Sequence, residues 1–156
     1  MKKVIALSIL LSLYGSLSFA NEIKANSNQK KVYQKTFGMI KPSGIDKTNE
    51  IKSIISSNSL KIIKSKKIIM TEKLFNKLYF MHANKPFYSE LKASLVGKEV
   101  IPMVIYGDRA VEKYRIAVNE IRAKYAINKT ENAVHGSDSW KRAHEEICIF
   151  FECKSK

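Results

Sequence analysis

Acidic residues are scarce in this chain. Its 14 aspartates and glutamates stand against 28 lysines and arginines, which gives a formal net charge of +14. Such an excess of positive charge attracts polyanions, but it does not select among nucleotides, nucleic acids and acidic surfaces. The sequence also lacks the G-x-x-x-x-G-K-[ST] pattern of P-loop proteins. A bound triphosphate would therefore have to be held by side-chain cations and a metal ion.

The sequence shows no internal repeat, no low-complexity tract and no second domain. With 156 residues and 45% hydrophobic composition, the chain has the size and composition of one globular domain with a core of its own. It is too short for two domains of ordinary size. We therefore expect a single folded domain.

The first segment holds an apolar run that is too short for a membrane span. Two lysines precede the apolar residues 4–13, and residues 16–20 supply small side chains at the positions that a signal peptidase recognises. The sequence therefore predicts a signal peptide over residues 1–20, cleaved after Ala20. The protein would be exported, periplasmic or secreted, with no stable membrane anchor.

The absence of a cysteine near the predicted cleavage point argues against a lipoprotein. Cleavage would lower the formal net charge from +14 to +12, because two lysines are lost. Residues 21–31 are polar and without periodicity, which predicts a flexible leader. Residues 32–156 would then form the folded domain.

The two cysteines, Cys148 and Cys153, lie close to the end of the chain. If both belong to one helix, the five-residue step turns them roughly 140° apart, which is poor geometry for a bridge. This spacing favours free thiols. A strained or intermolecular disulfide remains the alternative.

Apolar periodicity predicts an alternation of strands and helices. The predicted strands cover residues 32–40, 60–70, 100–106 and 132–135. One predicted helix begins at about residue 46, and a second covers about residues 72–82 and is capped by Thr71. Three more cover about residues 88–96, 109–118 and 139–151. The last helix has an apolar stripe that includes Trp140, and residues 119–130 have no clear assignment. This order predicts an α+β protein, a ferredoxin-like βαββαβ sandwich whose four-stranded antiparallel sheet is covered by helices.

One stretch gathers the residue types of a phosphate site. Residues 132–139 place His135 at the end of a short apolar run, and Gly136 then lets a ligand approach the backbone closely. Small polar residues that can cap a helix follow. His135 therefore lies where a strand becomes a helix, a junction with free N–H groups and the positive end of a helix dipole. Lys41 ends the first strand, and loops after strands often bind ligands.

Two motifs resemble those of a known family. Residues 132–139, Asn-Ala-Val-His-Gly-Ser-Asp-Ser, resemble the N-x-x-H-G-S-D-S/A signature of nucleoside diphosphate kinases at every defined position. Residues 37–44, Phe-Gly-Met-Ile-Lys-Pro-Ser-Gly, are similar to the family's first-strand motif F-x-x-I-K-P-D-G. The resemblance extends from about Tyr33 to Phe151.

The resemblance implies an enzyme, a phosphotransferase that moves the γ-phosphate of a nucleoside triphosphate to a nucleoside diphosphate. The reaction would be ping-pong, with a phosphohistidine intermediate on His135. Glu146 would accept the proton of one imidazole nitrogen, so that the other nitrogen can attack. Lys41, Arg115 and Arg122 would bind the phosphates.

The resemblance also implies the contacts to the nucleoside. Tyr79 would form a hydrogen bond near the catalytic histidine, and Asn132 would bind the sugar hydroxyl. Phe87 would stack on the base, with Leu91 following at the matching spacing. For Tyr79, Phe87 and Leu91 the alternative is packing in the core.

Several positions depart from the family pattern. Arg115 and Arg122 are only seven positions apart, so the loop that normally separates them is shortened and the T-N-P segment is missing. The same loop commonly builds subunit contacts, which leaves the size of the implied homo-oligomer open. Ser43 replaces the usual aspartate, and Lys129 replaces an apolar residue that covers the base.

The implied partners are ATP and nucleoside diphosphates, with Mg²⁺ arriving on the nucleotide and bridging its β- and γ-phosphates. The alternative function is a non-catalytic, basic module that binds nucleotides or nucleic acid on the same fold. Nucleic acid is not the favoured partner. The lysines of the second strand are assigned to a solvated face rather than to a nucleic-acid stripe: Lys61, Lys64, Lys66 and Lys67.

Overall fold

The computed structural model describes residues 30–153, and the part that begins at Val32 forms one compact unit. The predicted signal peptide, its cleavage after Ala20 and most of the predicted leader lie outside the described residues. Between residues 30 and 153, no helix is both long and apolar enough to cross a membrane.

The described residues form five strands, five α-helices and two short 3₁₀ helices. The strands are β1 (Tyr33–Ile40), β2 (Lys61–Ser65), β3 (Ile68–Ile69), β4 (Glu99–Asp108) and β5 (Val134–Gly136). The helices are η1 (Pro42–Lys47), α2 (Thr48–Ser57), α3 (Glu72–Tyr79), η2 (Phe80–His82), α4 (Tyr88–Leu95), α5 (Ala110–Tyr125) and α6 (Trp140–Phe150).

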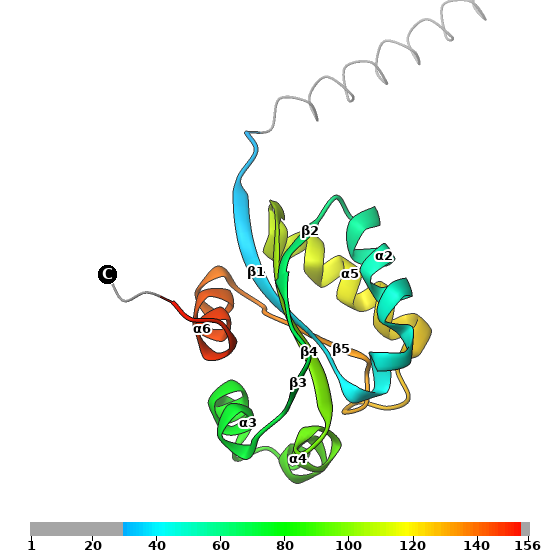
Figure 1. Cartoon of the computed structure of the whole chain (residues 1–156), viewed down its shortest axis with the longest axis vertical. Coiled ribbons are helices and arrows are strands. Elements are labelled where there is room, and N and C mark those ends of the chain that lie inside the picture. Colours follow the sequence, from blue (N-terminus) through cyan, green and yellow to red (C-terminus); the bar gives the residue numbers. More distant parts are fainter. Residues whose placement is uncertain (1–29, 154–156) are drawn as a thin grey trace, which may run out of the picture. The chain divides into compact units, whose positions relative to one another are not determined.

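The strands form one antiparallel sheet in the order β2-β4-β1-β5, and β3 pairs with β4. Helices α2 and α5 lie on one face of the sheet, and α3, α4 and α6 lie on the other (Figure 1). The order β1-α2-β2-β4-α5-β5 confirms the predicted α+β, ferredoxin-like βαββαβ sandwich. Helices α3 and α4 are inserted before β4, and α6 follows β5.

The central part of the sheet is buried on both faces because its strands alternate apolar side chains between two cores. Phe37 and Met39 of β1 pack with α3, α4 and α6. Met103 and Ile105 of β4 pack beneath α2 and α5. The central strands therefore carry nearly continuous apolar runs, which is why the sequence pattern identified them.

The largest differences from the predicted boundaries concern two elements. The predicted strand 60–70 is two strands, β2 and β3, separated by the exposed residues 66–67, and β2 itself has a register shift against β4 between Ile62 and Lys64. The helix predicted to end at residue 118 continues to Tyr125. It continues because Val118 and Ile121 keep the same face buried against the sheet.

Trp140 does not belong to the buried stripe of α6, contrary to the prediction. Its side chain is 65% exposed, whereas Ala143 and Phe150 on the same helix are buried. The first turn of α6 lies beside the start of β1, where Tyr33 and Lys35 are themselves exposed. There is no core beneath this turn for the indole to enter.

The prediction of free thiols is wrong, because Cys148 and Cys153 form a disulfide with their Cα atoms 5.2 Å apart. The angular argument placed both residues in one helix. Helix α6 ends at Phe150 instead, and the backbone is extended at Phe151, with φ −127° and ψ 136°. The extended tail carries Cys153 back beside the last turn of the helix.

Reduction of this disulfide is expected to lower the free energy of unfolding by about 2 kcal/mol, the chain-entropy value for a loop this short. Urea unfolding of oxidised and reduced protein measures the difference. The double variant Cys148→Ser/Cys153→Ser serves as the control. Its unfolding midpoint should match that of the reduced protein and should not change when reductant is added. An unchanged midpoint on reduction of the natural protein would contradict the prediction.

Candidate active site

Strand pairing brings the two motifs of the sequence together. β1 pairs with β5 so that Met39 lies opposite His135. Just beyond β1, the backbone N–H of Lys41 donates to the carbonyl oxygen of Ala133 at 2.8 Å. Lys41 and His135, far apart in the sequence, therefore end on neighbouring strands of the same sheet.

His135 is held by a buried carboxylate. Its Nε2 lies 3.1 Å from Oε2 of Glu146, whose side chain is 3% exposed. Ser137 donates its hydroxyl to the same oxygen at 2.6 Å, and Arg142 donates to Oε1 at 3.1 Å. Because an ionised carboxylate only accepts hydrogen bonds, Nε2 carries the proton and Nδ1 is left with a free lone pair.

The surroundings keep this imidazole neutral and this carboxylate ionised. Burial lowers the pKa of His135, and the hydrogen bond and charge of Glu146 offset that effect only in part. Burial alone would raise the pKa of Glu146. The hydrogen bonds from His135 and Ser137 and the charge of Arg142 outweigh burial, so the pKa of Glu146 is lowered. Near pH 7 the pair is a neutral base beside a carboxylate.

Lys41 is buried at the end of β1, with only 4% of its surface exposed. Its Nζ donates to the carbonyl oxygen of Thr130 at 3.1 Å and to Oδ1 of Asn132 at 2.8 Å. Burial and the positive charge of Arg122 lower the pKa of Lys41 to about 7. The ammonium group has two neutral partners and no carboxylate partner among the described residues.

Arg115 and Arg122 extend from one side of α5 toward β5. Arg115 donates to the carbonyl oxygen of Gly136 at 3.4 Å. Arg122 donates to the carbonyl oxygen of Val134 through Nη2 at 3.0 Å and through Nε at 3.3 Å. Burial and the charge of Arg115 lower the pKa of Arg122. A cleft of ≈ 530 Å³, lined in part by Arg115 and Asp138, adjoins this cluster.

Tyr79 lies against the histidine. Phe87 and Leu91, both predicted to bind the nucleotide, differ in their exposure to solvent. Tyr79 is 4% exposed, and its ring meets the His135 ring edge-on at 5.6 Å between centroids. Its hydroxyl is buried without a hydrogen-bond partner among the described residues. Phe87 is 42% exposed just before α4, while Leu91 is 5% exposed and belongs to the core beneath α3, α4 and α6.

Asn132 and Gly136 both have structural partners. Asn132 accepts from Lys41 and donates Nδ2 to the carbonyl oxygen of Lys129 at 2.8 Å. A Cβ atom at Gly136 would lie 2.9 Å from side-chain atoms of Tyr114 and Val118. The lack of a side chain at Gly136 therefore lets α5 pack against β5, a role that the sequence analysis did not foresee.

Three residues of the site were not assigned a role there by sequence reasoning. Ser137 lies inside the recognised motif but was considered only as a helix cap, and the cap is Ser139, which accepts from the backbone N–H of Arg142. The position of Arg142, four residues before Glu146 on one helix, was the available signal. Thr130 bonds to Glu90 of α4 at 2.6 Å, a contact with no local signal.

Comparisons with known proteins agree on one family. A family model described as nucleoside diphosphate kinase matches residues 34–155. The chain is 36% identical over 134 residues to a nucleoside diphosphate kinase of Wolbachia pipientis subsp. Culex pipiens, covering 78% of this chain and 96% of that protein. It is 36% identical over 133 residues to a nucleoside diphosphate kinase of Saccharolobus islandicus, with the same coverage.

Solved structures of the same enzyme superpose well on this fold. The nucleoside diphosphate kinase of Encephalitozoon cuniculi is 27% identical, with a TM-score of 0.72, covering 79% of this chain and 92% of that chain. The halophilic enzyme of Halobacterium salinarum, in complex with CDP, is 27% identical, with a TM-score of 0.71, covering 78% of this chain and 90% of that chain.

The affinity for ADP is expected to fall as the pH rises from 7 to 9. Lys41, with a pKa of about 7, then loses the charge that a phosphate requires. The loss should reach about tenfold per pH unit. Calorimetric titrations at fixed Mg²⁺ measure the affinity, and binding at pH 8 should take up protons from the buffer.

Lys41→Gln is the matched control. It should bind ADP more weakly than the natural protein at pH 7, with an affinity that hardly changes up to pH 9. An affinity of the natural protein that is constant over the same range would contradict the role given to the lysine charge.

Proposed function

Because the chain belongs to the nucleoside diphosphate kinase family, we propose that His135 carries the phosphoryl group in its reaction. The enzyme transfers the γ-phosphate of a nucleoside triphosphate to a nucleoside diphosphate. The observation that carries the choice of His135 is its hydrogen bond to Glu146, which leaves Nδ1 unprotonated and nucleophilic.

The proposed reaction has two half-reactions. Nδ1 of His135 attacks the γ-phosphorus in line, and the bond from that phosphorus to the β-phosphate oxygen breaks. The nucleoside diphosphate leaves, and the phosphoryl group remains on nitrogen. A β-phosphate oxygen of a second nucleoside diphosphate then attacks the phosphorus, the N–P bond breaks, and the lone pair returns to Nδ1. Glu146 stabilises the positive charge that the ring gains in the intermediate.

Three positively charged side chains of the site are suited to bind the phosphates of the nucleotide. Lys41, Arg115 and Arg122 are bonded in the free protein to neutral carbonyl and amide oxygens. An anionic phosphate oxygen is a stronger acceptor than a carbonyl oxygen. We therefore propose that these three side chains turn from their present acceptors to the β- and γ-phosphates when the nucleotide binds.

The nucleoside would lie over Phe87, whose exposed ring is free to stack on a base. Leu91 supports that region from the core. Asn132 would bond to the sugar hydroxyl, and Tyr79 would offer its unpaired hydroxyl beside the imidazole. The homo-oligomer implied by the family resemblance remains a prediction.

Magnesium would enter with the substrate. Between residues 30 and 153, no group of three or more histidine, cysteine, aspartate or glutamate side chains is placed to hold a metal ion. Both oxygens of Glu146 already accept hydrogen bonds, so this carboxylate is not a free ligand. We propose that Mg²⁺ arrives bound to the phosphates of the nucleotide and neutralises part of their charge.

The alternative of a non-catalytic nucleotide-binding module is not favoured. The relatives that are 35–37% identical over most of the chain are named as kinases. A binder would also have no need of a neutral imidazole held against a buried carboxylate.

We also propose that the protein is exported, with cleavage after Ala20. The charged start, apolar run and small residues of positions 1–20 support this proposal. The disulfide between Cys148 and Cys153 supports it independently, because disulfides persist in oxidising compartments and are rare in the cytosol.

Labelled Mg·ATP should place a base-stable, acid-labile phosphoryl group on the purified protein, and added GDP should remove it as GTP. His135→Ala should lose the label and reduce turnover on the order of 10³-fold or more, because the nucleophile is gone. His144→Ala, at an exposed histidine of α6, is the matched control and should behave as the natural protein does. Label that persists in His135→Ala would refute the assignment, and nucleotide binding without any label would favour the binding module.

Expression of the complete chain in a bacterium should yield a processed protein outside the cytosol that begins at Asn21. Intact mass and terminal sequencing measure both the cut and the disulfide. A chain lacking residues 2–20 should remain in the cytosol and keep its kinase activity. Unprocessed protein found only in the cytosol would contradict the proposal.

A further inference from the structure

The face of the sheet that carries α6 is uncovered where β1 begins. Tyr33 of β1 is 57% exposed and Tyr106 of β4 is 36% exposed. The two rings stack, with centroids 5.6 Å apart and planes within 16° of each other. Two large aromatic surfaces are therefore open to solvent at a place where α6 no longer covers the strands.

Lysines flank the tyrosines in register across three strands. Tyr106 is paired with Lys35 of β1 on one side and with Lys61 of β2 on the other. Directly paired residues point to the same face of a sheet, so these three side chains form a row on the uncovered face. Lys64 lies in the next row beside Val104. All three lysines are exposed and form no salt bridge with a described residue.

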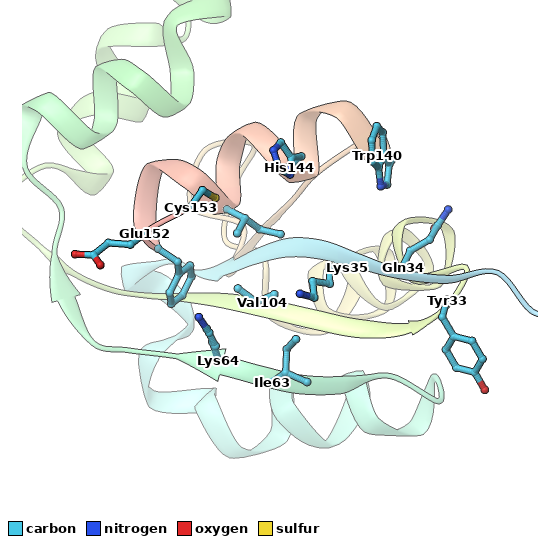
Figure 2. Close-up of a pocket in the computed structure, with 12 residues that line it drawn as sticks. Tyr33, Gln34, Lys35, Ile63, Lys64, Val104, Trp140, His144, Glu152 and Cys153 are labelled. Atoms are coloured by element: carbon cyan, nitrogen blue, oxygen red, sulfur yellow. The ribbon is translucent and has the colours of Figure 1, made fainter. Parts of the chain in front are cut away.

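A cleft of ≈ 340 Å³ continues this face beneath α6. Figure 2 shows Lys35, Lys64 and Val104 along the strands, with Trp140 and His144 on the helix beside them. The Trp140 and His144 rings lie nearly parallel, with centroids 6.4 Å apart. None of the residues that line this cleft belongs to the cluster around His135.

We propose that this tyrosine–lysine face, formed by Tyr33, Lys35, Lys61, Lys64 and Tyr106 and bordered by Trp140, binds single-stranded nucleic acid. Exposed bases would stack on the aromatic rings, and the phosphates between them would pair with the lysines. The site is separate from the nucleotide site and does not depend on the proposed phosphoryl transfer.

Charge and shape favour a single strand over other polyanions. A duplex hides the faces of its bases, so it could use the lysines but not the stacking surfaces. Two carboxylates lie at the margins, those of Asp108 and Glu152. Asp108 is already bonded to the N–H of Val32 at 2.7 Å and to Lys113 at 3.3 Å, so it opposes a polyanion only weakly.

The test uses the chain's single tryptophan, Trp140, as a built-in reporter. Titration of the purified protein with a 12-nucleotide single strand should quench its fluorescence, and anisotropy of a labelled strand should give the same affinity. Saturating Mg·ADP should not displace the strand, because the nucleotide site lies elsewhere. His135→Ala should bind it unchanged.

Two sets of variants separate stacking from charge. Tyr33→Ala/Tyr106→Ala should weaken strand binding on the order of tenfold or more. Lys35→Gln/Lys61→Gln should lower the slope of log affinity against log salt by roughly 0.7 for each lysine. The control Lys73→Gln/Lys98→Gln makes the same charge change at exposed sites away from this face. Kinase activity should be unchanged in every variant, which shows that each is folded.

The proposal is overturned if the strand fails to bind at low salt, if ADP displaces it, or if it binds without quenching Trp140. It is equally overturned if a duplex, heparin or vesicles rich in phosphatidylserine bind as well as the strand and the tyrosine variant binds like the natural protein. That result would show that the face binds polyanions through its positive charge alone.

Discussion

The geometry of the site depends on one buried carboxylate. Glu146 lies on the apolar side of α6, where an ionised group is stable only if its oxygens are fully paired. His135, Ser137 and Arg142 supply the three donors. Because the carboxylate cannot move without losing them, it fixes which imidazole nitrogen carries the proton and which way the ring points. Phe150 of α6 stacks on Phe37 of β1, with ring centroids 5.1 Å apart. This contact fixes the helix against the strand that pairs with the His135 strand.

Helix α5 positions two of the three cations of the site. Arg115 and Arg122 are two helical turns apart, so their side chains leave the helix on the same side. They bond to the carbonyl oxygens of Gly136 and Val134, alternate residues of β5. β5 is the outer strand of the sheet, and alternate carbonyls of an outer strand face its open edge. The continuous helix therefore packs on one face of the sheet and presents two guanidinium groups to the open edge of β5.

The fold, and the placement of Lys41 and His135 near the ends of strands, could be predicted because they rest on local patterns. Apolar runs identified the central strands, and two short motifs identified Lys41 and His135. The features that the sequence did not predict depend on where helices end. The disulfide was missed because it requires α6 to end at Phe150. The length of α5 was missed although Ile121 and Tyr125 continue its apolar face at helical spacing. The packing role of Gly136 depends on Tyr114, a contact across the fold that no local pattern contains.

Electrostatic repulsion within the free site explains why it suits a polyphosphate. Burial and the charge of Arg122 lower the pKa of Lys41, and burial and the charge of Arg115 lower the pKa of Arg122. Glu146 already accepts hydrogen bonds from His135, Ser137 and Arg142, so it is not free to neutralise them. The folded protein therefore holds these positive charges close together, and a ligand with several negative oxygens relieves their repulsion when the side chains turn to it. Negative charge is spread over the oxygens of the phosphoryl group during its transfer. A cluster of cations of this kind can therefore stabilise that charge throughout the transfer from the nucleotide to the histidine.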